Sequence, residues 1–518
     1  FKSTGSGKIT VTANADNPKL VATLGSGADK FTTADDGFAA TDAYSVDAGD
    51  GEDTLIIGSN TGDLDSDDEG GRYKNFDVLQ YAANANFDVD HIPSSIDAAS
   101  IGDGGLGKMS VALAKDITVT ADNAGSTFTL ASATGSSDVI SFTAANSTST
   151  ASADLTTVTL DGFETLNYAS NSGDALTTAT SDRNTIGFTS ATSLKTVTLT
   201  GTKSVDADIA TNGASLTKIT TLDASGVTGG AVLETGGQTG ALTVTGSAVA
   251  DSITVGAVGT GGSITVNSGA GKDTITTTQA IAAAQTINGG DGTDTLTMTD
   301  VSASDAALTI NDATFKNITN VETISLSGTI VGDLLWTAGG YANTLAGSAT
   351  DNTLKFSAKA ITSNTKSTDI VTIDASNLSG TNAVNLDIKD TAVGATKTGA
   401  ITLTGSDGAD TITFEQAKAA SASLTVITGG KGNDKITVKS TSDHAGKIVV
   451  NSGAGDDTID VSATTTDATV NLNLLTPGAG NDTIKLDTAG ADTDYEIVLG
   501  SSAALTGVNT ITNYLIGT

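Results

Sequence analysis

Short runs in which apolar and polar residues alternate recur along the whole chain. The clearest runs follow an aspartate directly, at residues 411–414, 435–438, 458–461 and 483–486. A period of two is typical of a strand that buries one face. The best helical pattern, at residues 414–421, would form about two turns. We therefore expect an all-β chain with few or no long helices.

A glycine-rich turn phrase ending in aspartate precedes many of these runs. It occurs at residues 25–29, 49–53, 269–273, 289–294, 405–410, 429–434, 453–457 and 478–482. Successive aspartates in the last array are 24, 23 and 25 residues apart. A coil of two short strands and two turns needs about 18 residues, so each interval holds one coil with a longer return turn. The spacing predicts a parallel β-solenoid with the glycine turns stacked along one edge.

The distribution of these turns predicts six segments. Other stretches, such as 73–81, 155–160, 194–199, 216–222, 315–324 and 505–514, keep the apolar anchor and the strand but lack the glycine turn. The predicted segments are 1–60 with turns, 61–110 as an acidic insertion, 111–240 as a Thr/Ser-rich solenoid, 241–300 with turns, 301–400 as a solenoid without them, and 401–518 as the clearest array with the C-terminal coils.

Composition narrows the function classes. The chain has 59 acidic residues, of which seven are glutamate, against 25 basic ones, for a net charge of −34. This charge argues against a nucleic-acid partner, which needs Lys and Arg. The absence of cysteine excludes disulfides, cysteine-ligated zinc and thiol nucleophiles. Aspartate in such excess over glutamate belongs to turns and to oxygen-ligand metal sites.

Catalysis has few candidate residues. The two histidines, His91 and His444, lie in no recognisable catalytic motif, and surface positions are expected for both. Carboxylate pairs for glycoside hydrolysis stay open, because so many aspartates offer chance pairs. No apolar run approaches the ~20 residues of a membrane span, and no signal peptide opens the chain. Because the chain begins at Phe1, we expect a processed product or a fragment. Trp336 is expected to be a core or interface anchor, and the sequence predicts no enzyme.

The turns combine two features of a calcium site. Glycine permits positive φ, which lets backbone carbonyls point inward, and aspartate adds a hard anionic ligand. Ligand sets of six to eight oxygens select Ca²⁺, whereas Mg²⁺ prefers a tighter octahedron. One turn supplies too few ligands, but two turns stacked about 4.8 Å apart can hold an ion between them.

The phrase Gly-Gly-x-Gly-x-Asp-x-apolar-x, fullest at 288–297 and 428–437, resembles the calcium motif of the RTX (repeats-in-toxin) family. The resemblance implies a β-roll that binds several Ca²⁺ ions between adjacent coils. The carboxylate ligands it implies are Asp29, Asp53, Asp273, Asp294, Asp407, Asp410, Asp434, Asp457 and Asp482. The carbonyl ligands it implies are Gly25, Gly27, Gly49, Gly51, Gly269, Gly271, Gly290, Gly292, Gly405, Gly408, Gly430, Gly432, Gly453, Gly455, Gly478 and Gly480.

The chain departs from the family pattern in several places. Family repeats are nine residues long, whereas intervals of 21–25 predict a single metal edge. The phrase at 246–251 lacks the second glycine, which predicts no ion there, and 347–352 carries Asn in place of the ligand Asp. Plain turns that bind no ion are the alternative for the whole set. The acidic stretch 63–70 resembles an EF-hand loop but lacks its glycine and final glutamate, so a solvated loop is favoured.

Composition and loose repeats together resemble bacterial surface-layer (S-layer) proteins within the RTX group. The resemblance implies type I secretion, an extracellular cell-surface location and self-assembly into a calcium-dependent two-dimensional lattice, hexameric symmetry being one form it could take. Attachment to the cell would use a region outside this chain, and residues 513–518 could belong to a C-terminal secretion signal. An RTX adhesin fragment that binds a surface or glycan is the alternative function, and the passive carrier region of a secreted enzyme is a third.

Overall fold

The computed structural model separates the chain into two compact units, Phe1–Gly271 and Lys272–Thr518. Their boundary falls inside the predicted 241–300 segment; the other predicted joins stay predictions. The structure describes residues 1–13, 19–33, 45–57, 70–81, 87–89, 93–133, 135–146, 151–173, 183–210, 216–277, 284–299, 308–327, 334–338, 341–342, 345, 353–361, 370–390, 399–416, 424–440, 446–464, 473–486, 495–499 and 507–513.

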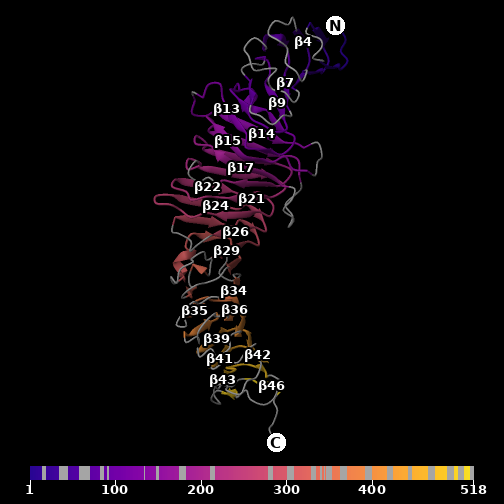
Figure 1. Cartoon of the computed structure of the whole chain (residues 1–518). Coiled ribbons are helices and arrows are strands. Elements are labelled where there is room, and N and C mark those ends of the chain that lie inside the picture. The colour runs from indigo at the N-terminus through magenta and orange to yellow at the C-terminus, as the bar shows by residue number, and fades with distance from the viewer. Residues whose placement is uncertain are drawn as a thin grey trace. The chain divides into compact units, whose positions relative to one another are not determined.

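The first unit consists of parallel sheets whose strands alternate along the chain (Figure 1). Its longest sheet contains, in spatial order, β1 (Thr10–Thr12), β3 (Lys30–Thr32), β5 (Thr54–Ile57), β7 (Val78–Tyr81), β9 (Ala98–Ile101), β11 (Ile117–Val119), β14 (Val139–Ala144), β16 (Thr165–Ser170), β18 (Thr196–Gly201), β20 (Thr221–Val227), β22 (Ala241–Thr245) and β24 (Ser263–Asn267). A second sheet contains β12 (Asn123–Ala124), β15 (Leu155–Asp161), β17 (Asn184–Ser190), β19 (Val205–Asp208), β21 (Ala231–Glu234) and β23 (Ser252–Val255), with β13 (Thr127–Thr129) beside β15. The shorter elements are β2 (Val21–Gly25), β4 (Ser45–Gly49), β6 (Tyr73–Lys74), β8 (Phe87–Asp88), β10 (Leu106–Gly107), β25 (Ala270–Gly271) and the 3₁₀ turns η2 (Gly70–Arg72) and η4 (Leu113–Lys115).

The second unit repeats this plan. It begins with β26 (Thr274–Thr277), β27 (Gln285–Asn288), β28 (Asp291–Gly292), β29 (Thr295–Thr299), β31 (Ile318–Thr319) and β32 (Thr323–Ser327), and the 3₁₀ turn η5 spans Asp312–Phe315. One long sheet follows as β30 (Leu308–Ile310), β33 (Leu334–Thr337), β35 (Val371–Asp374), β37 (Ile401–Thr404), β39 (Thr425–Lys431), β41 (Ile448–Ala454), β43 (Asn473–Thr476) and β45 (Tyr495–Ile497). The other contains β34 (Thr353–Ile361), β36 (Ala383–Asp390), β38 (Thr411–Gln416), β40 (Lys435–Ser440), β42 (Thr458–Thr464), β44 (Thr483–Lys485) and β46 (Thr510–Thr512).

The strand register follows the spacing of the turn phrase. In the second unit, the residues that directly follow successive turn aspartates are paired: Thr411 with Lys435, Lys435 with Thr458, and Thr458 with Thr483. One coil therefore spans each aspartate interval, and these strands of consecutive coils pair in parallel. The predicted all-β parallel solenoid is confirmed.

Stacked apolar side chains form the core of each unit. Inward and outward residues alternate along the strands, so that Ile412, Ile436, Ile459 and Ile484 are all fully buried and lie in register above one another. Burying such a side chain contributes roughly 1.5–3 kcal/mol. In the first unit, aromatic residues also fill the core: Phe128 of β13 and Phe142 of β14, which belong to different sheets, meet edge-on with ring centroids 4.9 Å apart. Because each strand buries one face in this core, apolar and polar residues alternate along the sequence.

Several smaller predictions can be compared with the structure. The predicted helical stretch 414–421 is wrong where it is described, because Phe414 to Gln416 belong to strand β38. Trp336 is buried and meets Phe315 edge-on, as expected for a core anchor. No helix within the described ranges is long and apolar enough to cross a membrane. The acidic stretch 63–69, the phrase 347–352, His91 and His444 lie outside the described residues.

Candidate metal-binding turns

Glycines four and two residues before the turn aspartate give these turns their backbone path. In the second unit, the glycine four residues before it has φ of 126° at Gly430, 106° at Gly453 and 85° at Gly478. The glycine two residues before it has φ of 92° at Gly432 and 136° at Gly455. Residues with a side chain rarely adopt this region. We call a turn with glycine at both positions a glycine-type turn; these turns end at Asp29, Asp53, Asp273, Asp294, Asp434, Asp457 and Asp482.

Close stacking of the coils is a second reason for glycine. A Cβ on Gly453 would overlap the carbonyl oxygen of Gly430 on the preceding coil, and a Cβ on Gly478 would overlap that of Gly453. The turn carbonyls of one coil therefore lie directly against the backbone of the next turn. A side chain at these positions would push the coils apart.

The turn aspartates form a ladder along this edge. The backbone N–H of Asp410 donates to Oδ1 of Asp434 over 2.8 Å, and the N–H of Asp434 donates to Oδ1 of Asp457 over 2.8 Å. The N–H of Asp457 donates to Oδ1 of Asp482 over 3.0 Å. The first unit repeats the contact, since the N–H of Asp29 donates to Oδ1 of Asp53 over 2.7 Å. One oxygen of each carboxylate thus joins adjacent coils.

The second carboxylate oxygen has no donor in most of these turns. Oδ2 is buried and lacks a hydrogen-bond partner in Asp29, Asp53, Asp294, Asp434, Asp457 and Asp482. Leaving a buried polar group unsatisfied costs about 1–3 kcal/mol, and more when the group is charged. A cation beside these oxygens would remove that penalty.

Burial also raises the pKa values of these carboxyl groups. The pKa of Asp434 rises to about 7, because burial disfavours its charge and Asp410 and Asp457 repel it. Burial raises the pKa values of Asp53 and Asp294 to about 6 for the same main reason. A bound cation favours the ionised form and opposes such shifts.

The donor set available to an ion consists of oxygen atoms. No group of three or more His, Asp or Glu side chains in the described ranges could hold a metal by itself. An ion would therefore need backbone carbonyls as well as Oδ2. The carbonyl of Gly453 accepts the N–H of Ala479 over 2.9 Å, which leaves one lone pair. Carboxylate and carbonyl oxygens suit a hard cation such as Ca²⁺, so the glycine-type turns fit the ion that the resemblance implies.

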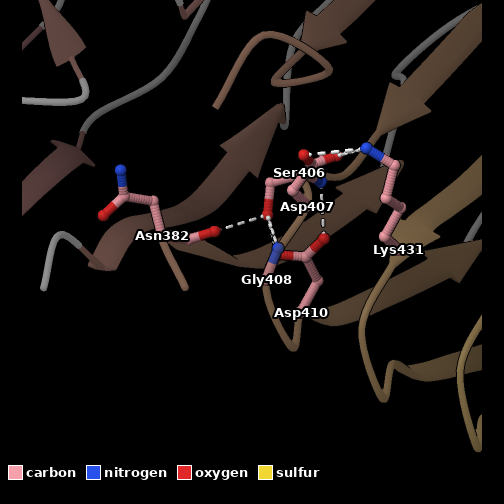
Figure 2. Close-up of polar contacts among 6 residues, drawn as sticks. All are labelled: Asn382, Ser406, Asp407, Gly408, Asp410 and Lys431. Atoms are coloured by element: carbon pink, nitrogen blue, oxygen red, sulfur yellow. Dashed lines mark hydrogen bonds and ion pairs between the residues drawn. The ribbon is translucent and has the colours of Figure 1, made fainter. Parts of the chain in front are cut away.

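The turn at 405–410 is built differently (Figure 2). Asp407 is paired with Lys431, whose Nζ lies 2.9 Å from its carboxylate. Oδ2 of Asp410 accepts the N–H of Ser406 over 2.6 Å, and Oδ1 lies 2.7 Å from the Ser406 hydroxyl. Gly408 has no left-handed backbone, and its N–H donates to that hydroxyl over 3.2 Å. Asp407 and Asp410, both predicted ligands, therefore have protein partners.

The ladder also contains residues that the glycine phrase does not reveal. Asp77 accepts the N–H of Asp53 over 2.8 Å, and Glu322 accepts that of Asp294 over 2.6 Å. Each is preceded two residues earlier by an asparagine with left-handed backbone, Asn75 (φ 57°) or Asn320 (φ 52°). This asparagine is the sequence feature that could have revealed these ladder residues. Asn509 ends the ladder by accepting the N–H of Asp482 over 3.0 Å.

No family model, no curated protein and no solved structure matches this chain.

Proposed function

We propose that this chain is a calcium-binding structural protein of a bacterial surface layer, which folds outside the cell and self-assembles there into a two-dimensional lattice. The observation that carries the proposal is the row of buried aspartate Oδ2 atoms without donors. Turn carbonyls such as that of Gly453, which retains a lone pair, would supply the further ligands. A Ca²⁺ ion at these turns would satisfy the Oδ2 atoms that lack donors. The lattice part of the proposal rests on the resemblance in composition and repeats.

Calcium would control folding through the charge of the turns. In the cytoplasm, where Ca²⁺ is scarce, the ladder carboxylates repel one another, which favours the unfolded and exportable chain. Outside the cell, sites with Kd of about 10⁻⁴–10⁻³ M would fill. A site at tenfold saturation contributes about 1.4 kcal/mol, so several sites together contribute about 5–10 kcal/mol to folding.

Calcium would also allow acidic copies to meet. The chain carries a net charge of −34, which opposes contact between copies at low ionic strength. Ions bound along the turns reduce this charge where they bind. The partner in the lattice is then a second copy of the chain, and attachment to the cell uses a region outside it.

Electron microscopy of the purified chain tests the proposal. Samples are compared in millimolar Ca²⁺, in Mg²⁺ at the same concentration, and with chelator. We expect ordered sheets or rings in Ca²⁺ alone that dissolve when chelator is added. Isolated particles in all three conditions would refute the lattice and make the adhesin fragment the better hypothesis. Sheets that persist in chelator would refute the role of calcium.

A further inference from the structure

Among the described residues, two turns end at an aspartate but carry serine four residues before it. Ser247 precedes Asp251 in the first unit, and Ser406 precedes Asp410 in the second. In both turns, the serine and the residue two positions before the aspartate lack left-handed backbone. We call these two the serine-type turns. Their backbone path therefore differs from that of the glycine-type turns.

In the second unit, Ser406 contacts both carboxylate oxygens of Asp410 (Figure 2). Its N–H donates to Oδ2 over 2.6 Å, and its hydroxyl lies 2.7 Å from Oδ1 and 2.8 Å from the carbonyl oxygen of Asn382. Oδ1 also accepts the N–H of Val384 over 2.7 Å. Both oxygens of Asp410 therefore have donors within the protein, unlike those of Asp434 on the next coil.

The turn in the first unit has the same contacts. The N–H of Ser247 donates to Oδ2 of Asp251 over 2.6 Å, and the hydroxyl donates to Oδ1 over 2.8 Å. Oδ1 also accepts the N–H of Ala231 over 2.6 Å. The N–H of Val249 donates to the Ser247 hydroxyl over 3.2 Å, as that of Gly408 does to Ser406. The arrangement thus follows from serine at this position, since the flanking residues differ between the two turns.

We propose that serine replaces the cation in these two turns, so that both close without metal. An ion at Asp410 or Asp251 would meet carboxylate oxygens that already accept protein donors, whereas an ion at Asp434 would meet an Oδ2 that accepts none. The Ser406 turn also contacts a positive charge, because Asp407 is paired with Lys431 from the turn of the next coil. The metal part of this inference rests on the proposed function.

Three substitutions at Ser406 in the full chain separate the possibilities. Ser406→Gly restores glycine at the fourth position before the aspartate, Ser406→Ala removes the hydroxyl but keeps a Cβ, and Ser406→Thr keeps both. Bound Ca²⁺ is counted by equilibrium dialysis at saturating calcium. Thermal unfolding in chelator is followed through Trp336, the only tryptophan, which lies in the same unit.

We expect Ser406→Gly to bind one Ca²⁺ more than the wild type, while Ser406→Ala gains none. In chelator, both variants should unfold at a midpoint about 3–10 °C lower, because a hydrogen bond to a charged group is lost. Ser406→Thr should match the wild type in both measurements. Loss of an ion in Ser406→Ala would show that the serine-type turn binds metal and would overturn the proposal.

The same data distinguish this inference from the proposed function. If no form of the chain binds calcium, the proposed function is refuted and the metal part of the inference falls with it. The midpoints in chelator then still test the hydroxyl, because an unchanged midpoint in Ser406→Ala overturns its closing role. If Ser406→Gly does not fold, the equivalent Ser247→Gly and Ser247→Ala variants of the first unit provide the test, with circular dichroism as the readout.

Discussion

Replacing Asp434 with asparagine should stabilise the chain without calcium and destabilise it with calcium. Asparagine keeps the Oδ1 that accepts the N–H of Asp410, so the ladder contact at 2.8 Å survives. Asn509 already accepts the N–H of Asp482 in this way. The substitution therefore removes the buried charge and replaces Oδ2 with an amide nitrogen, while it preserves the stacking of the coils.

The pKa of Asp434 sets the size of the effect. Burial raises this pKa from 3.8 to about 7. A carboxyl group whose folded pKa is raised stabilises the fold fully below pH 4, and that stability is lost as the pH rises through 7. The rise of the pKa from 3.8 to about 7 corresponds to about 4 kcal/mol of stability lost at pH 8, which the asparagine would regain. The unpaired asparagine amide subtracts about 1–3 kcal/mol from this gain. We expect Asp434→Asn to gain about 1–3 kcal/mol in chelator at pH 8, and to lose stability in calcium because one ligand is missing.

Urea unfolding at pH 8, followed through Trp336 fluorescence, measures both arms. Asp456→Asn is the matched control, because it removes the same charge from an exposed neighbour of Asp457. This control should shift stability by less than about 0.5 kcal/mol in either condition. If Asp434→Asn destabilised the chain in chelator as well, the argument from a buried charge would be refuted. If it stabilised the chain in calcium, Asp434 would not be a ligand.

Three further predictions concern the glycines, the core and the ion pair. Gly453→Ala should cost about 2–4 kcal/mol of unfolding free energy in urea, because φ is 106° and the added Cβ would overlap the Gly430 carbonyl. Gly261→Ala is the control: φ is 83°, but the added Cβ would have no atom within 4 Å, so only about 1–2 kcal/mol should be lost. Ile436→Ala should cost about 2–5 kcal/mol, because Ile436 is fully buried between neighbours in register, and calorimetry would show this as a lower melting temperature. Asp407→Asn should change stability by less than about 1 kcal/mol and leave the number of bound Ca²⁺ ions unchanged, because Asp407 is paired with Lys431 at the surface; loss of an ion by dialysis would contradict its assignment.

The sequence by itself determined the solenoid. Intervals of 24, 23 and 25 residues between turn aspartates equal the step between paired strands, because each coil places the same turn at the same edge. Alternating apolar residues such as Ile412 and Phe414 indicated which face is buried, since side chains on a strand point to opposite faces. The glycines at positive φ were also predictable, because glycine lacks a Cβ and adopts this backbone conformation without steric cost.

Only the tertiary structure decided which aspartates keep a free oxygen. Asp410 and Asp434 follow nearly identical phrases, yet Ser406 supplies donors to Asp410, whereas Oδ2 of Asp434 has none. The difference depends on the residue four positions before the aspartate, and a serine there reaches the carboxylate only once the turn has folded. Glu322 joins the ladder for a related reason, because any side-chain oxygen that reaches the N–H of the preceding coil can take part, whatever the motif around it. Contacts between coils are set by stacking across intervals of more than 20 residues, which a local pattern does not encode.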